Sequence, residues 1–308
     1  MTRTTRSDAV AGPDLSHPEP RAGLPGLVLV VPALLFYGVF VLRPLAATVQ
    51  YSFYDWDGIG VAAWVGVENY IRLLTDPELI NPILNAFQLI LYFSIIPVIF
   101  GVVAAAIIRR LGQSKMAFAS RTVLFLPQVI PLVAAGIMWT WLMATDGLIN
   151  QILNGLGLDF LSRAWLGDFD TALPAVGVIG AWVNVGLCML LMLAGMTKID
   201  PALYEAARLD GAGSIREFFS VTLPAIRPEL GIAVIITVIS ALRSFDIIYI
   251  STQGGPGNST LVPGLEIYYL AFFEREIGQA SALAVALTIL VLAVVLPLNR
   301  LSRMGSGS

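Results

Sequence analysis

Six long apolar runs dominate this chain of 308 residues. At a rise of about 1.5 Å per residue, a helix of about twenty residues crosses the roughly 30 Å of hydrocarbon in a bilayer. A segment in lipid must satisfy its own backbone hydrogen bonds, so helices are the expected spanning elements. The runs do not alternate between apolar and polar residues, which argues against a β-barrel. The expected spans are Leu24–Val49 (interrupted by Arg43-Pro44), Pro82–Ile108, Thr122–Met143, Ala172–Met196, Glu229–Ile250 and Gly278–Leu298.

Composition supports an all-α membrane protein with six transmembrane helices. The chain is 57% hydrophobic and 13% charged, whereas a soluble domain is about a quarter charged. Its net charge of -3 and the absence of a basic cluster argue against a nucleic-acid-binding protein. The lone Cys188 and the lone His17 cannot form a zinc cluster or a Cys–His nucleophile pair, so we expect no catalytic or metal site. We expect Cys188 to be a buried, inert thiol.

Lysine and arginine are distributed unevenly between the two sides that six spans would create. Cytoplasmic termini would place 13 of these residues inside and three outside, at Arg72, Arg163 and Arg275. Basic residues are enriched in cytoplasmic loops, so this distribution predicts that both termini are cytoplasmic. An even number of spans agrees with that topology. The inside residues are Arg3, Arg6, Arg21, Arg109, Arg110, Lys115, Arg121, Lys198, Arg208, Arg216, Arg227, Arg300 and Arg303.

Three regions are expected along the chain. Residues 1–22 are polar and rich in Pro, Ser, Thr and Arg, which is typical of a disordered tail. Residues 23–303 would form the six-span membrane domain, and residues 304–308 a flexible tail. The first apolar run is too long for a signal peptide and lacks a small-x-small cleavage site, so we expect an uncleaved span.

A polar, helix-forming loop, residues 197–228, separates the fourth and fifth apolar runs. Asp200 is expected to cap a helix that starts at Pro201, since aspartate accepts hydrogen bonds from free N–H groups and proline suits a first turn. The glycine-containing sequence 210–213 should end this helix, because glycine adopts turn geometry that other residues resist. The predicted topology places the whole loop in the cytoplasm.

The second half of this loop is expected to form another short helix. Ser214 and Glu217 have the spacing of a capping box, and Pro224 should help to stop the helix before the fifth span. Phe218 and Phe219 are expected to anchor the helix against the transmembrane segments. A rigid helix–turn–helix tied to two spans would be a suitable docking element for another protein.

The exposed face of the first loop helix carries Glu205, Ala206 and Ala207. The two alanines have almost no side chain, so another protein's backbone could approach closely, and Glu205 would supply a charged anchor. An ordinary amphipathic loop is the alternative interpretation. The string EAA-x-x-DGA-x-x-x-x-x-F-x-x-x-x-LP, residues 205–224, is much more specific than the three letters EAA alone.

This string resembles the EAA loop of importer permeases in the ATP-binding-cassette (ABC) class. The resemblance extends over nearly the whole chain from about residue 25, to the MalF-like permeases of carbohydrate importers in their compact six-span form. The other matching stretches are Leu34-Leu-Phe, Arg43-Pro44, Ser52-Phe-Tyr-Asp-Trp56, Val65-Gly-Val-Glu-Asn-Tyr70, Phe125-Leu-Pro-Gln-Val-Ile-Pro131, Trp139-Thr-Trp141, Phe245-Asp246 and Thr252-Gln-Gly-Gly-Pro256.

The resemblance implies a type I ABC importer permease fold in a bacterial inner membrane. It implies a second homologous permease, a pair of ATPase subunits and an extracytoplasmic solute-binding protein as partners. ATP and Mg²⁺ would be bound by the ATPase and no cofactor by this chain, which has no Gly-x-x-x-x-Gly-Lys-Ser/Thr phosphate loop. The residues implied to couple to the ATPase are Glu205, Ala206, Ala207, Asp210, Gly211, Phe218 and Pro224.

Polar residues within the apolar runs are candidates for a substrate pathway, because polar groups are costly in lipid. Arg243 and Asp246 are three residues apart on the expected fifth helix, close enough to pair. They could form a structural ion pair, or they could line the pathway and contact sugar hydroxyls. Ser240 and Ser244 would lie on the same face of the expected fifth helix. Their hydroxyls could serve helix packing or contact the substrate. Asn184 could bond another helix or line the pathway.

Other polar and aromatic features of the spans have less direct interpretations. Trp139 and Trp141 are expected in an interfacial aromatic belt, although either could stack on a sugar ring. Pro127 and Pro131 should kink the third span. Gly254-Gly255-Pro256-Gly257 should form a turn at the outer end of the fifth span.

Two other classes of protein compete with the permease interpretation. A secondary transporter driven by an ion gradient would need internal repeats and charged ion sites within the spans, and we see no clear repeat and few such charges. A membrane enzyme would need a clustered catalytic or metal set, which the sequence lacks. The sequence does not identify the sugar, because hydroxyl recognition needs only a few scattered polar groups.

Overall fold

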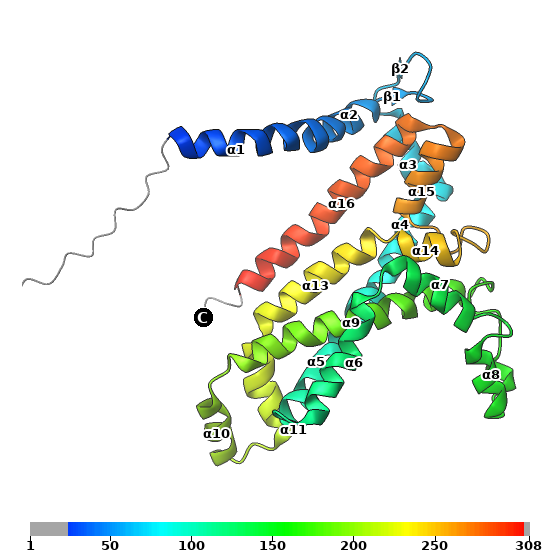
Figure 1. Cartoon of the computed structure of the whole chain (residues 1–308). Coiled ribbons are helices and arrows are strands. Elements are labelled where there is room, and N and C mark those ends of the chain that lie inside the picture. Colours follow the sequence, from blue (N-terminus) through cyan, green and yellow to red (C-terminus); the bar gives the residue numbers. More distant parts are fainter. Residues whose placement is uncertain (1–23, 305–308) are drawn as a thin grey trace, which may run out of the picture. The chain divides into compact units, whose positions relative to one another are not determined.

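The computed structural model describes residues 24–304, with side chains described from residue 30 to residue 300 (Figure 1). Residues 1–47 and 48–308 form separate units, and we describe each by itself. The expected tail of residues 1–22 lies outside the described residues, as do residues 305–308. Met304 is the last residue of helix α16 rather than part of a tail.

The first unit is helical throughout its described part. Helix α1 (Leu24–Tyr37) continues through a π-helical turn, η1 (Gly38–Leu42), into α2 (Arg43–Tyr51), whose end belongs to the second unit. Arg43-Pro44 therefore does not interrupt the helix, which passes from the π-helical turn directly into α2 at this point. The segment Val30–Tyr51 is long and apolar enough to cross a membrane.

A short hairpin follows at the start of the second unit. Strands β1 (Tyr54–Asp55) and β2 (Ala63–Trp64) pair antiparallel. Asp57 closes the turn by accepting hydrogen bonds from the backbone N–H groups of Ile59 and Gly60 at 2.9 and 2.7 Å. These bonds hold the pKa of the Asp57 carboxyl below its usual range. The expectation of an all-α fold missed this hairpin, because two-residue strands leave no detectable alternation.

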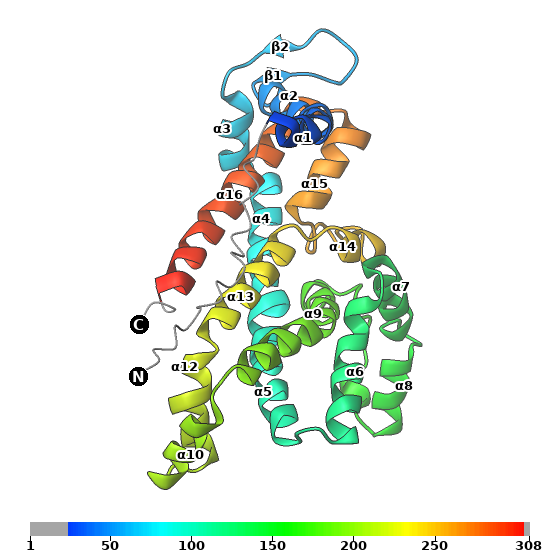
Figure 2. The same cartoon turned by 60° about the vertical axis from the view of Figure 1, so that its left-hand side comes forward.

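Helices form the rest of the second unit (Figure 2). Several are joined end to end through π-helical turns, and one 3₁₀ turn follows α8. Their bounds are α3 (Glu68–Thr75), α4 (Pro77–Ile90), η2 (Leu91–Ile95), α5 (Ile96–Arg110), α6 (Lys115–Val129), α7 (Leu132–Leu142), α8 (Leu148–Gly155), η3 (Asp159–Leu161), α9 (Ala172–Thr197), α10 (Pro201–Leu209), α11 (Ser214–Glu217), η4 (Phe218–Thr222), α12 (Leu223–Ala225), α13 (Arg227–Leu242), α14 (Asp246–Ser251), α15 (Pro263–Tyr269), η5 (Leu270–Glu274) and α16 (Ile277–Met304).

The expectation of six spans is confirmed in part. In the described part of the chain, four helical segments are long and apolar enough to cross a membrane, and two bent helix pairs raise this to as many as six. The four are Val30–Tyr51, Pro77–Arg110, Ala172–Thr197 and Ile277–Arg300. The bent pairs are α6 with α7, at 101°, and the 214–225 segment with α13, at 69°.

Two expected spans are broken rather than continuous. The third bends between α6 and α7, where Ile130 adopts an extended conformation before Pro131. A residue before proline is disfavoured in the helical region, which explains the position of the break. The expected fifth span ends at Leu242, and α14 starts at Asp246 after three non-helical residues. The prediction of one helix through Ile250 is therefore wrong.

Helix α9 is the central packing element of the second unit, between α5, α6 and α13 (Figure 2). Gly101 of α5 allows the closest approach, since a Cβ there would lie 2.6 Å from the Cβ of Cys188 and 2.8 Å from the backbone N of Met189. Cys188 is buried among apolar side chains of α5, α6, α9 and α13, as the sequence predicts.

Glu266 of α15 lies outside the candidate spans, in a cavity of about 700 Å³ with several other carboxylates. Its side chain is buried. Burial raises the pKa of Glu266 to about 7, and the neighbouring charges of Glu274, Glu78 and Asp76 act in the same direction. Arg72 also lines this cavity. The folded protein therefore favours the protonated form of this carboxyl.

The raised pKa of Glu266 predicts that the stability of the folded protein depends on pH. Between the ordinary pKa of 4.5 and the folded value of about 7, the folded state binds more protons than the unfolded state, so stability should fall as pH rises through this window. Glu266→Gln removes the titrating group, and its Tm at pH 8 should exceed that of the wild type by about 3 °C. Thermal unfolding of the detergent-purified chain at pH 5 and pH 8 measures the difference.

The exposed Glu276 lines the same cavity and provides the control. Glu276→Gln should leave the difference between pH 5 and pH 8 nearly unchanged. Equal Tm values for wild type and Glu266→Gln at pH 8 would contradict the prediction.

Candidate functional site

The loop of residues 197–228 folds as two short helical segments around a glycine turn. Asp200 caps α10, its carboxylate accepting a hydrogen bond from the backbone N of Ala202 at 2.9 Å, and Pro201 occupies the first turn. Both features agree with the sequence prediction. Gly211 has a φ of +78°, a left-handed conformation that ends the helix. The turn therefore depends on glycine at this position.

Three side-chain contacts hold this loop together and join it to the membrane helices. The Tyr204 hydroxyl lies 3.0 Å from the Thr222 hydroxyl, and both residues are buried. The guanidinium of Arg109, at the end of α5, stacks 3.8 Å above the Tyr204 ring. Lys198 pairs with Glu229 at 2.9 Å and joins the two ends of the loop. Arg109 and Glu229 therefore link the loop directly to α5 and α13.

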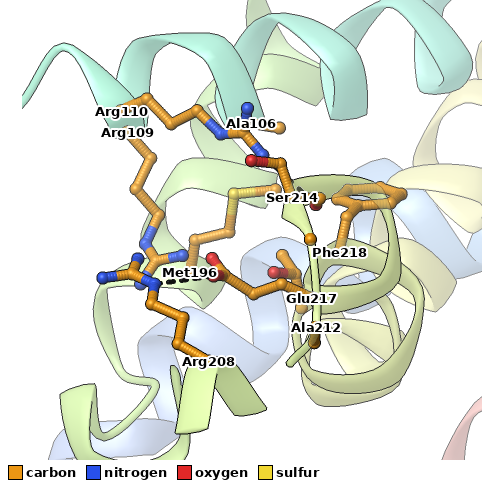
Figure 3. A pocket seen from close by; sticks show the side chains of 11 residues that line it. Ala106, Arg109, Arg110, Met196, Arg208, Ala212, Ser214, Glu217 and Phe218 are labelled. Atoms are coloured by element: carbon orange, nitrogen blue, oxygen red, sulfur yellow. Dashed lines mark hydrogen bonds and ion pairs between the residues drawn. The ribbon is translucent and has the colours of Figure 1, made fainter. Parts of the chain in front are cut away.

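The second half of the loop departs from the expected capping box. Gly213, not Ser214, is the N-cap of α11. The Glu217 carboxylate instead accepts a 3.0 Å bond from Arg208, which joins α11 to α10 (Figure 3). This charge-assisted bond outcompetes a bond to a neutral backbone N–H. It also raises the pKa of the Arg208 guanidinium.

Pro224 does not stop the second helical segment, contrary to expectation. The chain stays helical from Ser214 to Ala225, through the π-helical turn η4. Pro224 is the second residue of α12 and directly follows the π-helical turn. Phe218 packs against the apolar cluster around α9, as expected, whereas Phe219 is exposed.

The structure leaves the outer face of α10 open to solvent. Glu205, Ala206, Asp210 and Gly211 are exposed and Ala207 is half-buried. Two apolar side chains that the sequence analysis missed lie on the same helix: Leu203 is 54% exposed and Leu209 89% exposed. The sequence indicates both leucines, because they are large apolar residues within a polar loop. An exposed surface of leucine, alanine and glutamate can bind another protein.

A second site is a cavity of about 590 Å³ at the two helix breaks. Its wall comes from the α6–α7 break, from α9, and from the α13–α14 break. All five residues that the sequence analysis selected as pathway candidates line it, namely Asn184, Ser240, Arg243, Ser244 and Asp246. The structure thus brings together candidates that are up to sixty-two residues apart in the sequence.

The geometry of these candidates differs from the expected helical pairing. Arg243 and Asp246 are exposed, and no ion pair joins them in the described part of the chain, because the helix ends between them. Ser244 is buried in the break, so it does not share a helical face with Ser240, and its hydroxyl has no hydrogen-bond partner. Asn184 donates to the carbonyl of Gly180 on its own helix at 2.9 Å, not to another helix.

Sequence reasoning missed other residues that line this cavity. Gln128 precedes the α6–α7 break, and its buried Oε1 has no partner. Phe93 and Phe245 supply aromatic surface. The sequence signal for Gln128 was its polar amide side chain, which lies in an apolar run between Pro127 and Pro131. The cavity therefore offers hydroxyl, amide, carboxylate and guanidinium groups beside aromatic rings.

The tryptophans near this cavity have different environments. Trp139 packs edge-to-face against Trp182, with ring centroids 5.6 Å apart, and does not line the cavity. It packs against a buried apolar cluster. Trp141 is 75% exposed, and the belt position of both residues stays a prediction. Residues 254–257 form a turn, as expected, with Gly254 and Gly257 at positive φ.

Comparison with known sequences identifies the family of the chain. The family described as "Binding-protein-dependent transport system inner membrane component" matches residues 97–304. The permease protein YurN of Bacillus subtilis is 35% identical over 271 residues, which cover 87% of this chain and 92% of that protein. The diacetylchitobiose uptake permease NgcF of Streptomyces coelicolor is 34% identical, covering 91% and 83%. The trehalose/maltose permease MalF of Thermococcus litoralis is 31% identical, covering 90% and 93%.

Solved structures agree on the fold. A chain of a bacterial ABC transporter that imports the acidic polysaccharide alginate superposes with a TM-score of 0.78 at 23% identity, covering 90% of this chain and 94% of that one. This match supports the ABC importer permease fold expected from the sequence. The chain therefore belongs to the family of binding-protein-dependent transport system inner membrane components, as a multi-pass permease subunit of an ABC importer and not as an enzyme.

Proposed function

We propose that this chain forms half of the translocation pathway for a sugar or sugar-like solute and couples to a separate ATPase through residues 197–228. The observation that carries the proposal is the cavity of about 590 Å³ at the two helix breaks. Its volume is within the range of roughly 300–1,000 Å³ that is typical of small-molecule sites. The five candidate pathway residues would contact the solute there.

The chemistry of this cavity suits a polyhydroxylated solute. Ser244 and Gln128 have buried oxygen atoms without partners, which a sugar hydroxyl could satisfy. Arg243 and Asp246 supply a donor and an acceptor that are not paired with each other. Phe93 and Phe245 offer apolar surface for a sugar ring. Relatives named for diacetylchitobiose and trehalose/maltose support the same substrate class.

Coupling to the ATPase would use the exposed face of α10. Glu205, Ala206 and Ala207 would contact the ATPase, while Asp210 and Gly211 would set the turn behind them. Phe218 and Pro224 would transmit movement to the membrane helices. ATP and Mg²⁺ act on the partner chain in this scheme. A second permease and a solute-binding protein complete the proposed complex, in line with the family description and with an alginate transporter solved with its periplasmic protein.

The proposed topology has six spans in a type I importer fold, with both termini in the cytoplasm. The 13-to-3 distribution of basic residues supports it. It places the loop of residues 197–228 on the side where ATP is available. Closure of the ATPase dimer would then draw the loop inward and open the cavity to the outside.

Co-purification in mild detergent from the native membrane tests the proposed complex. We expect an ATPase, a second permease and a solute-binding protein to be recovered with this chain, and ATP-driven uptake of a sugar after reconstitution. Recovery of this chain alone, with uptake that collapses when the ion gradient is dissipated, would refute the proposal.

Glu205→Lys should reduce recovery of the ATPase by about tenfold. Reversal of an exposed charge at the centre of a docking surface replaces an attraction with a repulsion, and a loss of about 1.4 kcal/mol lowers affinity tenfold. Quantitative pull-down of the ATPase measures the effect. Asp170→Lys makes the same charge change at an exposed carboxylate on the predicted outer side and should leave recovery unchanged. Equal recovery with Glu205→Lys would exclude Glu205 from the interface.

A further inference from the structure

Two neighbouring cavities lie between the loop of residues 197–228 and α5, apart from the outer face of α10 and from the cavity at the helix breaks. We call the first the basic pocket. It has a volume of about 590 Å³ and lies between the end of α5 and the 208–222 segment (Figure 3). The second, the apolar groove, has a volume of about 290 Å³. The two share Ala106, Arg110, Ser214 and Phe218, so one ligand can occupy both.

The basic pocket has an excess of positive charge. Arg109, Arg110 and Arg208 line it together with a single carboxylate, Glu217. Arg208 is paired with that carboxylate at 3.0 Å. In the described part of the chain, neither Arg109 nor Arg110 forms an ion pair: Arg109 stacks on a tyrosine ring, and Arg110 donates to the backbone carbonyl of Ser214 at 3.2 Å. Two guanidinium groups are therefore left for an anion.

The apolar groove is lined by side chains that face outward. Val103 and Ile107 of α5 are 50% and 56% exposed, and Ile215 and Phe219 of the loop are 76% and 61% exposed. Large apolar side chains at the surface of a membrane protein contact acyl chains. Arg110 is the last residue of the candidate span Pro77–Arg110, and a basic residue at the end of a span is suited to meet lipid head groups.

We propose that the basic pocket and the apolar groove together bind one anionic phospholipid. Its phosphate lies with Arg109 and Arg110, whose planar donors match phosphate oxygens, and one acyl chain lies in the groove. Basic pockets between membrane helices on the cytoplasmic side are suited to such head groups. A free phosphate would leave the apolar groove uncovered, and a zwitterionic lipid would leave the excess positive charge uncompensated. The lipid bridges α5 and α11 and so braces the loop.

The proposal rests on the membrane location of the chain and not on its coupling to an ATPase, so lipid binding can be measured on the permease alone. The full chain is purified in mild detergent, stripped of lipid and titrated with dioleoyl-phosphatidylglycerol or dioleoyl-phosphatidylcholine, with bound lipids counted by native mass spectrometry. We expect one phosphatidylglycerol to bind at least tenfold more tightly than phosphatidylcholine.

Three variants and one competitor test the location of the lipid. Arg110→Gln should weaken phosphatidylglycerol binding about tenfold, whereas Arg216→Gln, on α11 but outside both cavities, should not. Ile107→Ser leaves the arginines intact and should weaken binding through the groove alone. Equal affinity for the two lipids, equal losses in Arg110→Gln and Arg216→Gln, or complete displacement of phosphatidylglycerol by inorganic phosphate would each overturn the proposal.

Discussion

Replacing Gly211 with proline is expected to abolish coupled transport while the chain still inserts into the membrane. Gly211 has a φ of +78°, whereas the proline ring holds φ near -65°. The substitution also removes the backbone N–H that donates to the carbonyl of Arg208 at 3.0 Å. A cost of about 3 kcal/mol in turn geometry reduces the population of the correctly folded loop on the order of 100-fold. Sugar uptake and substrate-stimulated ATPase activity of the reconstituted transporter measure the effect.

Gly213 provides the matched control in the same turn. Its φ is -72°, and a Cβ at this position would meet nothing within 4 Å. Gly213→Ala should therefore retain nearly full uptake. The amount of each variant in the membrane fraction separates failure of insertion from failure of coupling. Normal uptake by Gly211→Pro would refute the role of the turn.

The loop was largely predictable because its signals are local. Asp200, Pro201 and Gly211 act through backbone groups only one to three residues away, and each behaves as expected. The capping box failed because Glu217 has a second possible partner, Arg208, that becomes close only when α10 and α11 fold back on each other. Local sequence does not show which of two partners a carboxylate will choose.

The positions of the spans were also predictable, and so was the bend of the third span at Pro131, but the break in the fifth span was not. Apolar length locates α9 to within one residue of the expected Ala172–Met196. The break at residues 243–245 has no such signal, since residues 232–253 contain no proline or glycine. Ile247 and Ile248 are buried in a cluster with residues of α9 and with the η2 segment. Those tertiary contacts hold α14 apart from α13, against the local tendency to continue one helix.

The cavity at the two helix breaks was also predictable only in part. Polar residues in apolar runs identified Asn184, Ser240, Arg243, Ser244 and Asp246, and the structure gathers all five. Their chemical state was predicted less well, because the expected pairing of Arg243 with Asp246 assumed an unbroken helix. Gln128 was missed since its distance from Ser244 in the sequence hides their common location. The cost of placing polar groups in lipid identifies the candidate residues, whereas the helix breaks determine which of those residues have no ion-pair or hydrogen-bond partner.

Ser244→Trp should block uptake without loss of the ATPase partner. Ser244 is 8% exposed, and its hydroxyl has no partner in the wall of the 590 Å³ cavity. A tryptophan at this position projects into space that the solute must occupy. If the indole ring costs the solute about 1.4–2.8 kcal/mol in this cavity, uptake should fall roughly 10- to 100-fold. Uptake of radiolabelled sugar by proteoliposomes measures the block, and pull-down measures ATPase recovery.

A tryptophan placed outside the cavity is the control for the size of the introduced side chain. Val178 of α9 is 44% exposed and does not line the cavity, so Val178→Trp should leave uptake nearly unchanged. Ser244→Ala removes the hydroxyl without filling the cavity and should reduce uptake far less than tryptophan does. If Ser244→Trp transports normally, the pathway does not pass through this cavity. If uptake is blocked and ATPase recovery is also lost, the substitution has disrupted the fold rather than the pathway, and Ser244→Ala then decides whether the hydroxyl contacts the solute.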